Sequence, residues 1–156
     1  MSATAVIVIG LGELGSVFAQ GLLRSGHTVV PILRGTPPND VAKLHPTPTL
    51  VLVTVAEDDL GPALASLPDR WRDRVGLVQN ELLPPSWQKH GIHEPSVAVV
   101  WFEKKAGKSA RELLPTLVHG PRAALLADAL ARVSIGTREV DTGAEVLQAL
   151  IEENLY

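Results

Sequence analysis

The sequence contains no cysteine and very few aromatic residues, which make up 4% of its 156 residues. Without cysteine the chain has no disulfide, no thiolate zinc site and no thiol nucleophile. It also lacks an apolar run near the roughly 18 residues that a membrane-spanning helix needs. The N-terminal stretch Ala3 to Ile9 has neither the basic segment nor the cleavage site of a signal peptide. We therefore expect a cytoplasmic protein without a membrane partner.

Charge is also sparse, with 14 Lys and Arg against 17 Asp and Glu and a net charge of −3. Such a balance gives no basic surface for phosphate backbones, so we expect no nucleic-acid partner. No serine lies in a G-x-S-x-G elbow, which leaves a hydrolase triad without its nucleophile. His90 and His93 flank a helix-opposing Gly91 and have no adjacent third ligand, so we expect no metal site.

Hydrophobic residues, by contrast, make up 46% of the chain and fall into short runs. Runs without polar alternation are typical of strands buried on both faces of a parallel sheet. We expect strands at 4–9, 27–33, 50–55, 75–79, 97–102, 116–118 and 138–140, and helices at 14–24, 41–45, 58–67, 121–133 and 144–153. The alternation predicts an α/β fold, a doubly wound, mostly parallel sheet with helices on both faces.

Three local features refine this pattern. Residues 35–40 are rich in Gly, Pro, Asn and Asp, and we expect an irregular turn there before the short second helix. The charged segment 103–111 is expected to be a solvated connection. Pro121 is expected to occupy the first turn of the helix at 121–133.

A glycine-rich loop follows the first expected strand and opens the first expected helix. Its sequence is Gly10-Leu11-Gly12-Glu13-Leu14-Gly15, a G-x-G-x-x-G pattern in the context where it binds a dinucleotide. Gly10 would make the tight turn, Gly12 would let the backbone approach the pyrophosphate, and Gly15 would let the helix pack on the strand. We expect residues 1–152 to form one dinucleotide-binding domain of the Rossmann type, with the Glu13 carboxylate turned away from the phosphates. The alternative is that the glycines only shape the turn.

The end of the second expected strand indicates which dinucleotide is preferred. Domains that bind NAD usually place Asp or Glu about 20 residues after the glycines, to bind the ribose 2′-hydroxyl. This chain has Leu33-Arg34-Gly35-Thr36 there, and a guanidinium can pair with a 2′-phosphate that a carboxylate would repel. Arg34 and Thr36 therefore predict NADP, with NAD as the alternative and an ordinary surface charge as the other interpretation of Arg34.

These motifs, together with Gly26-His27-Thr28-Val29, resemble the cofactor-binding half of the ketopantoate reductase family. The segment Leu52-Val53-Thr54-Val55 is similar to the family's third-strand motif, and Val78-Gln79-Asn80 to its Gln-Asn-Gly motif. The resemblance implies an NADP-linked reductase ancestry, with Val55 and Ala56 beside the cofactor. It also implies that Asn80 contacts the cofactor and substrate and is the candidate catalytic residue, with a polar strand cap as the alternative.

The chain departs from the family pattern at several positions. Ala56 stands where the family usually has Lys, and the acidic Asp58-Asp59 that follows is expected to cap and charge a helix. Glu81 replaces the Gly of Gln-Asn-Gly, and its charge would disfavour a carboxylate substrate. We expect the family's helical substrate domain to be absent, and no Lys follows Lys108 in this sequence to act as its general acid.

Three functions remain open from the sequence. One is an oxidoreductase that reduces a small carbonyl or imine beside Asn80, with His119 or a residue of a partner subunit as proton donor. The others are a non-catalytic or regulatory dinucleotide-binding module and a fold that has lost its ligand. We expect a homodimer, because a domain without its usual helical partner exposes apolar surface. Residues 153–156 match the start of a common engineered protease-cleavage sequence and carry no functional argument.

Overall fold

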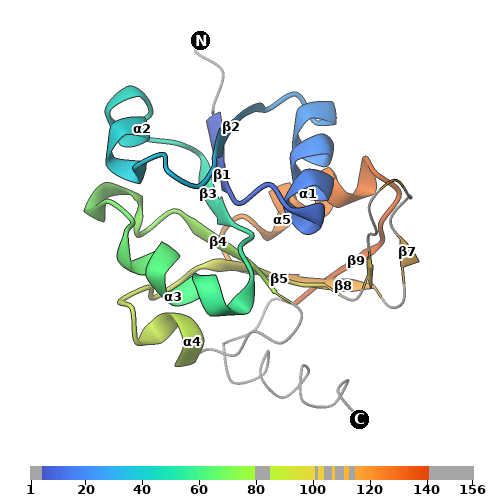
Figure 1. Cartoon of the computed structure of the whole chain (residues 1–156). Coiled ribbons are helices and arrows are strands. Elements are labelled where there is room, and N and C mark those ends of the chain that lie inside the picture. The colour runs from blue at the N-terminus through green and yellow to red at the C-terminus, as the bar shows by residue number, and fades with distance from the viewer. Residues whose placement is uncertain are drawn as a thin grey trace.

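The computed structural model describes residues 5–79, 85–100, 102–103, 107, 111–112 and 115–140 of the chain. Its strands are β1 (Ala5–Ile9), β2 (Thr28–Ile32), β3 (Leu50–Val53), β4 (Val75–Gln79), β5 (Ser96–Val99), β6 (Phe102–Glu103), β7 (Arg111–Glu112), β8 (Thr116–His119) and β9 (Thr137–Glu139). Its helices are α1 (Glu13–Arg24), α2 (Pro38–Leu44), α3 (Glu57–Ala65), α4 (Pro85–Gln88) and α5 (Ala123–Ala131), with a 3₁₀ turn at Asp69–Trp71 (Figure 1).

Seven strands form one sheet in the order β2-β1-β3-β4-β5-β8-β9. The first five are parallel to one another, β8 runs antiparallel to β5, and β9 is parallel to β8. The chain moves from β1 to β2 on one side and then crosses to β3 on the other. The strand order therefore reverses at the carboxyl ends of β1 and β3, where open α/β sheets bind their ligands.

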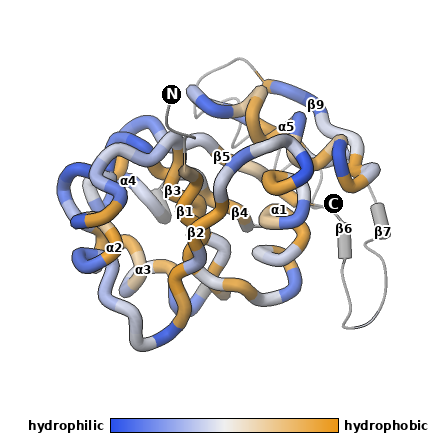
Figure 2. Tube along the Cα trace, turned by 90° about the horizontal axis from the view of Figure 1, so that it is seen from above, coloured by the Kyte–Doolittle hydropathy of each residue, from blue (hydrophilic) through white to orange (hydrophobic). Residues whose placement is uncertain are grey.

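Helices cover both faces of this sheet, which confirms the predicted Rossmann-type α/β fold. Val6 and Val8 of β1 belong to the core that includes Phe18 of α1 and residues of α5. Ile7 and Ile9, which alternate with them, face the other core, built with residues of α2, α3 and α4. Figure 2 shows apolar residues along the central strands, between these two helical layers. No helix in the described part of the chain is long and apolar enough to cross a membrane.

One expectation about a connecting segment was wrong. The irregular turn expected at 35–40 ends early, because α2 begins at Pro38 rather than at Val41. Proline suits a first helical position, where its fixed φ is favourable and its missing N–H has no partner to lose. At the ends of the segment 103–111, β6 and β7 pair in a two-stranded antiparallel ribbon, and most of the residues between them lie outside the described part of the chain. The expected strand at 97–102 is accordingly divided into β5 and β6.

The expected start of the last described helix was also wrong. Pro121 precedes α5, which begins at Ala123. The backbone N–H of Arg122 donates to the Ser96 hydroxyl at 2.7 Å, so the chain is tied to β5 before the helix starts. The helix expected at 144–153 lies outside the described residues.

Candidate functional site

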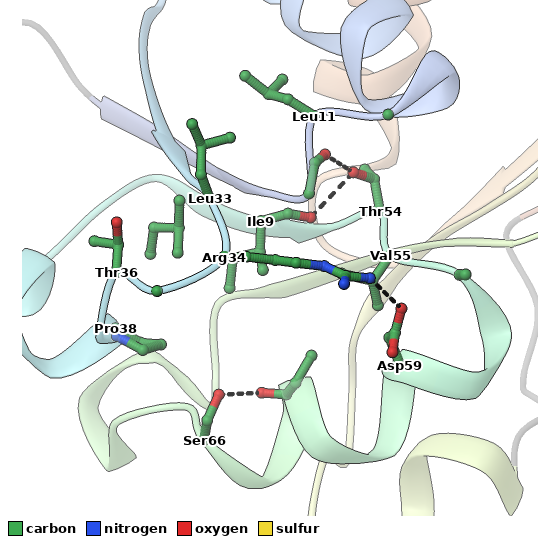
Figure 3. A pocket seen from close by; sticks show the side chains of 16 residues that line it. Ile9, Leu11, Leu33, Arg34, Thr36, Pro38, Thr54, Val55, Asp59 and Ser66 are labelled. Carbon is green, nitrogen blue, oxygen red and sulfur yellow. Dashed lines mark hydrogen bonds and ion pairs between the residues drawn. The ribbon is translucent and has the colours of Figure 1, made fainter.

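A cavity of about 510 Å³ opens at the carboxyl ends of β1, β2 and β3 (Figure 3). The glycine loop, the turn that follows β2, and α3 surround it. Its lining comprises Ile9, Gly10, Leu11, Gly12, Ile32, Leu33, Arg34, Gly35, Thr36, Pro38, Thr54, Val55, Ala56, Asp59, Ala63 and Ser66. The cavity thus coincides with the point where the strand order reverses.

The glycine loop leaves β1 through a sharp turn at Gly10, whose φ of +90° lies in the left-handed region that favours glycine. The Gly10 N–H donates to the carbonyl oxygen of Ile32 at 3.2 Å, which ties the turn to β2. A Cβ at Gly15 would lie 2.1 Å from the Gly10 carbonyl oxygen, so only glycine lets α1 approach the loop this closely. These positions fit the structural roles that the sequence predicted for them.

Gly12 differs from its neighbours because it faces open space. A Cβ added there would meet no described atom within 4 Å, and its φ of −75° suits any L-residue. Gly12 is the N-cap of α1, and no side-chain hydrogen bond to it is found among the described residues. Because the first amides of a helix have no intrahelical acceptor, α1 directs N–H groups and the positive end of its dipole toward this space. An anion is the ligand that such a helix end favours.

Thr54 holds the loop in place, a role that the sequence analysis missed. Its hydroxyl lies 3.0 Å from the carbonyl oxygen of Ile9 and also contacts that of Gly10 (Figure 3). Because one hydroxyl hydrogen serves two carbonyl groups, Thr54 can donate to either one and so joins the end of β3 to the start of the loop. The sequence feature that could have indicated this anchoring role is a hydroxyl residue directly after a buried apolar run.

Arg34 lies in a tight turn that carries its side chain over the cavity. The Thr36 N–H donates to the Leu33 carbonyl at 3.1 Å, and Gly35 has a φ of +88°. A positive φ at the third position is what a type II turn requires, so Gly35 allows the turn that presents Arg34. The Arg34 Nη2 atom lies 3.6 Å from Oδ2 of Asp59 on α3, with side chains 95% and 54% exposed. Figure 3 shows Arg34 extended toward Asp59 across the cavity.

The structure brings most of the predicted cofactor residues together, but not all of them. Gly10, Leu11, Gly12, Arg34, Thr36, Val55 and Ala56 line the cavity, whereas Glu13, Leu14 and Gly15 do not. Glu13 is the first residue of α1 and is exposed to solvent. The candidate catalytic residue Asn80 lies outside the described residues.

Asp58 and Asp59 do not have the capping role expected of them. The N-cap of α3 is Ala56, and no side-chain hydrogen bond caps this end in the described part of the chain. Asp58 and Asp59 lie in the first helical turn, where their charge favours the dipole, and Asp59 also lines the cavity. Asp59 reaches the cavity because α3 begins directly after β3, at the edge of the sheet where the cavity opens.

The histidines weighed from the sequence lie outside the cavity. His119 pairs with Val97, the second residue of β5, and its Nδ1 atom contacts the Val140 carbonyl. It is absent from the cavity lining as described. The described residues hold no group of three His, Cys, Asp or Glu that could bind a metal ion.

No protein-family model matches the sequence, and no curated protein sequence matches it. The fold is similar to that of 2-dehydropantoate 2-reductase from Methylococcus capsulatus, with a TM-score of 0.64, 16% identity, and coverage of 96% of this chain and 60% of that one. Synechocystis arogenate dehydrogenase gives a TM-score of 0.63 at 15% identity, covering 88% of this chain and 59% of that one. A reductive aminase from Aspergillus terreus, solved with NADPH4, cyclohexanone and allyl amine, gives a TM-score of 0.60 at 15% identity, covering 99% of this chain and 60% of that one.

Each of these neighbours is longer, and this chain spans about 60% of their length. An imine reductase from Myxococcus stipitatus, solved with NAD+, has a TM-score of 0.57 at 19% identity, covering 99% of this chain and 60% of that one. At such identities the likeness is one of fold. The chain has the Rossmann-like fold that these dehydrogenases and reductases share.

Proposed function

We propose that the chain binds NADP(H) in the cavity between the glycine loop and Arg34. One observation carries the proposal: the start of α1 behind Gly12 and the guanidinium of Arg34 border the same cavity. NADP has two anionic parts, a pyrophosphate and a 2′-phosphate, and these two features are of the kinds that bind such groups. The solved complexes of similar fold contain NADPH4 or NAD+, which supports a nicotinamide dinucleotide but not NADP over NAD.

The lining suggests how the dinucleotide would be held. Gly10, Leu11 and Gly12 would receive the pyrophosphate, and Arg34 with Thr36 the 2′-phosphate of the adenosine ribose. Between them the cavity is lined by apolar side chains, among them Ile32 and Val55. Glu13, Leu14 and Gly15 would act by forming the loop and the first turn of α1. Val55 and Ala56 would lie along the ligand at the end of β3.

A titration of the protein with NADPH and, separately, with NADH tests the proposal. We expect both to bind, NADPH more tightly, and we expect Gly12→Val to abolish binding of both. A Cβ at this position would meet no described atom within 4 Å, and a branched side chain there would occupy the space left for the pyrophosphate. Because valine is a poorer N-cap than glycine, the thermal unfolding midpoint of Gly12→Val should fall, but by no more than about 4 °C, so the fold is kept.

Ser16→Val, an exposed residue one turn later in α1 and absent from the described lining, is the matched control. It should bind both dinucleotides as wild type does. Wild-type affinity in Gly12→Val would place the ligand elsewhere. Failure of the wild-type chain to bind either dinucleotide would favour the interpretation that the fold has lost its ligand.

We further propose that the activity, if the chain is catalytic alone or with a partner subunit, is reduction of a small carbonyl or imine. NADPH supplies a hydride in such reactions, and a protein group supplies the proton. Arg34 and Asp59 are the ionisable side chains of the described lining, and they pair with each other. That pairing supports a second candidate function, a dinucleotide-binding module without catalysis. Loss of NADPH absorbance with 2-keto acids or cyclic imines as substrates would distinguish a reductase from a binding module.

A further inference from the structure

The ion pair between Arg34 and Asp59 joins two elements that otherwise form opposite sides of the cavity. Arg34 belongs to the turn after β2, and Asp59 to the first turn of α3. Their side chains meet over the space that both residues line (Figure 3). A guanidinium that is already engaged by a carboxylate has fewer donors for a phosphate, so the pair bears directly on the feature that favours NADP.

We propose that Asp59 is a cofactor-selectivity residue that competes with the 2′-phosphate of NADP for Arg34 and so limits the preference for NADPH over NADH. The inference rests on the proposed function and deepens it. Asp59 acts through Arg34, because the two charged groups lie 3.6 Å apart. When a 2′-phosphate binds Arg34, Asp59 either gives up its partner or lies close to a phosphate of like charge.

Exposure determines how large this effect is. With the Arg34 side chain 95% exposed and that of Asp59 54% exposed, water screens the pair and the contact opens readily. The pair therefore lowers affinity moderately rather than closing the site. A 2′-phosphate carries nearly two negative charges at neutral pH, whereas the 2′-hydroxyl of NADH carries none. Removing the Asp59 charge should consequently raise the affinity for NADPH and leave the affinity for NADH almost unchanged.

Asp58 provides a matched control, because it is also an exposed aspartate in the first turn of α3. The two carboxylates contribute similarly to the helix dipole and to net charge, but in the described structure only Asp59 lines the cavity and pairs with Arg34. A difference between Asp58→Asn and Asp59→Asn therefore reports the ion pair rather than a general change of charge.

The test measures dissociation constants of NADPH and NADH by calorimetry for wild type, Asp59→Asn, Asp58→Asn, Arg34→Ala and the double variant Arg34→Ala/Asp59→Asn. We expect Asp59→Asn to bind NADPH about three- to fivefold more tightly, with NADH changed by less than about twofold. Asp58→Asn should change NADPH affinity by less than about twofold. In the Arg34→Ala background, Asp59→Asn should give less than about a twofold gain, because the group for which it competes is gone.

The inference is overturned if Asp59→Asn gives no gain, if Asp58→Asn gives an equal one, or if the gain is the same without Arg34. In these cases wild type still binds the dinucleotide, so the proposed function stands. If none of the five proteins binds either dinucleotide, the proposed function fails and the inference with it. Binding that appears only in Asp59→Asn would support the competition in its strongest form.

Discussion

At the residue scale, Arg34 is the side chain on which the proposed preference for NADPH depends. Charge-assisted hydrogen bonds are worth about 1.5–3 kcal/mol each, so Arg34→Ala should weaken NADPH binding about ten- to a hundredfold. NADH lacks the phosphate, and its affinity should change by less than about threefold. Because Arg34 is exposed, the NADPH effect should shrink as salt rises to about 0.5 M. Arg34→Asp should invert the preference, since it repels the phosphate and offers the 2′-hydroxyl an acceptor.

Lys43→Ala is the matched control for Arg34→Ala. Lys43 is an exposed cation paired with Asp40, and it lies on α2 outside the described lining of the cavity. It should leave the affinity of both dinucleotides unchanged. Equal weakening of NADPH and NADH in Arg34→Ala would mean that Arg34 only holds the turn, and the argument for NADP would be lost.

Thr54 tests whether the loop depends on its hydroxyl anchor. Thr54→Val keeps the shape of the side chain but removes the donor to Ile9 and Gly10, which should cost about 1 kcal/mol of unfolding free energy. It should also weaken NADPH binding about two- to fivefold, since a looser loop must be ordered on binding. Thr54→Ser retains the hydroxyl and should bind NADPH nearly as wild type does. Chemical denaturation and calorimetry on the same samples measure both effects, and equal behaviour of the two variants would contradict the anchoring role.

Sequence reasoning identified these residues unevenly, for physical reasons. The location of Gly10, Gly12 and Arg34 beside the cavity could be predicted, because it depends on local backbone geometry and on spacing along the chain. Asp59 was expected to act only on its own helix, because its pairing with Arg34 depends on where two separate connections place α3 and the turn after β2. Thr54 was named only as part of the third-strand motif that is similar to the ketopantoate reductase family. Its hydrogen bond to the loop could not be predicted, because it depends on the pairing of β1 with β3.

At the scale of elements, α1 and α5 pack closely at Gly21. A Cβ at Gly21 would lie 2.1 Å from the backbone carbonyl oxygen of Ala129, an atom that cannot move without shifting α5. Gly21→Ala should therefore cost about 3 kcal/mol of overpacking, offset by about 1 kcal/mol of helix propensity. The net change predicts a melting midpoint lower by roughly 4–8 °C in a domain of this size.

Gln20→Ala, one residue earlier on the exposed face of α1, is the control and should leave the midpoint within about 2 °C of wild type. An unchanged midpoint in Gly21→Ala would show that the two helices do not meet as described. Calorimetric unfolding of both variants decides between these outcomes.

The element pattern itself was predictable where the hydrophobic runs are long. The order of strands and helices from β1 to β4 follows from that pattern, and β4 has the expected bounds. The reversal of β8 was not predicted, because a short apolar run has the same sequence pattern in a parallel and an antiparallel strand. The ribbon of β6 and β7 was missed because two residues on each side are too few for a periodic signal.

At the scale of the whole molecule, the two edge strands limit how copies of the chain can associate. β2 includes Pro31, which has no N–H to donate, and β9 has only three residues, with Arg138 and Glu139 exposed. Such features oppose pairing of one sheet with another. We propose a homodimer that associates through helical surfaces, where Leu23 on α1 and Leu44 on α2 are 60% and 80% exposed. Sedimentation equilibrium at micromolar to millimolar concentration should give twice the monomer mass, and a monomer throughout this range would refute the proposal.

The antiparallel direction of β8 also affects how this fold can change. Each parallel connection from β1 to β4 must bring the chain back from the carboxyl to the amino edge of the sheet. The connection from β5 to β8 begins and ends at the carboxyl edge, and a short turn would be enough to close it. The ribbon of β6 and β7 is therefore a module that insertion or replacement could alter while the order of the seven strands is kept. Evolution or protein engineering could use this point to add new specificity on the side of the sheet where the cavity opens.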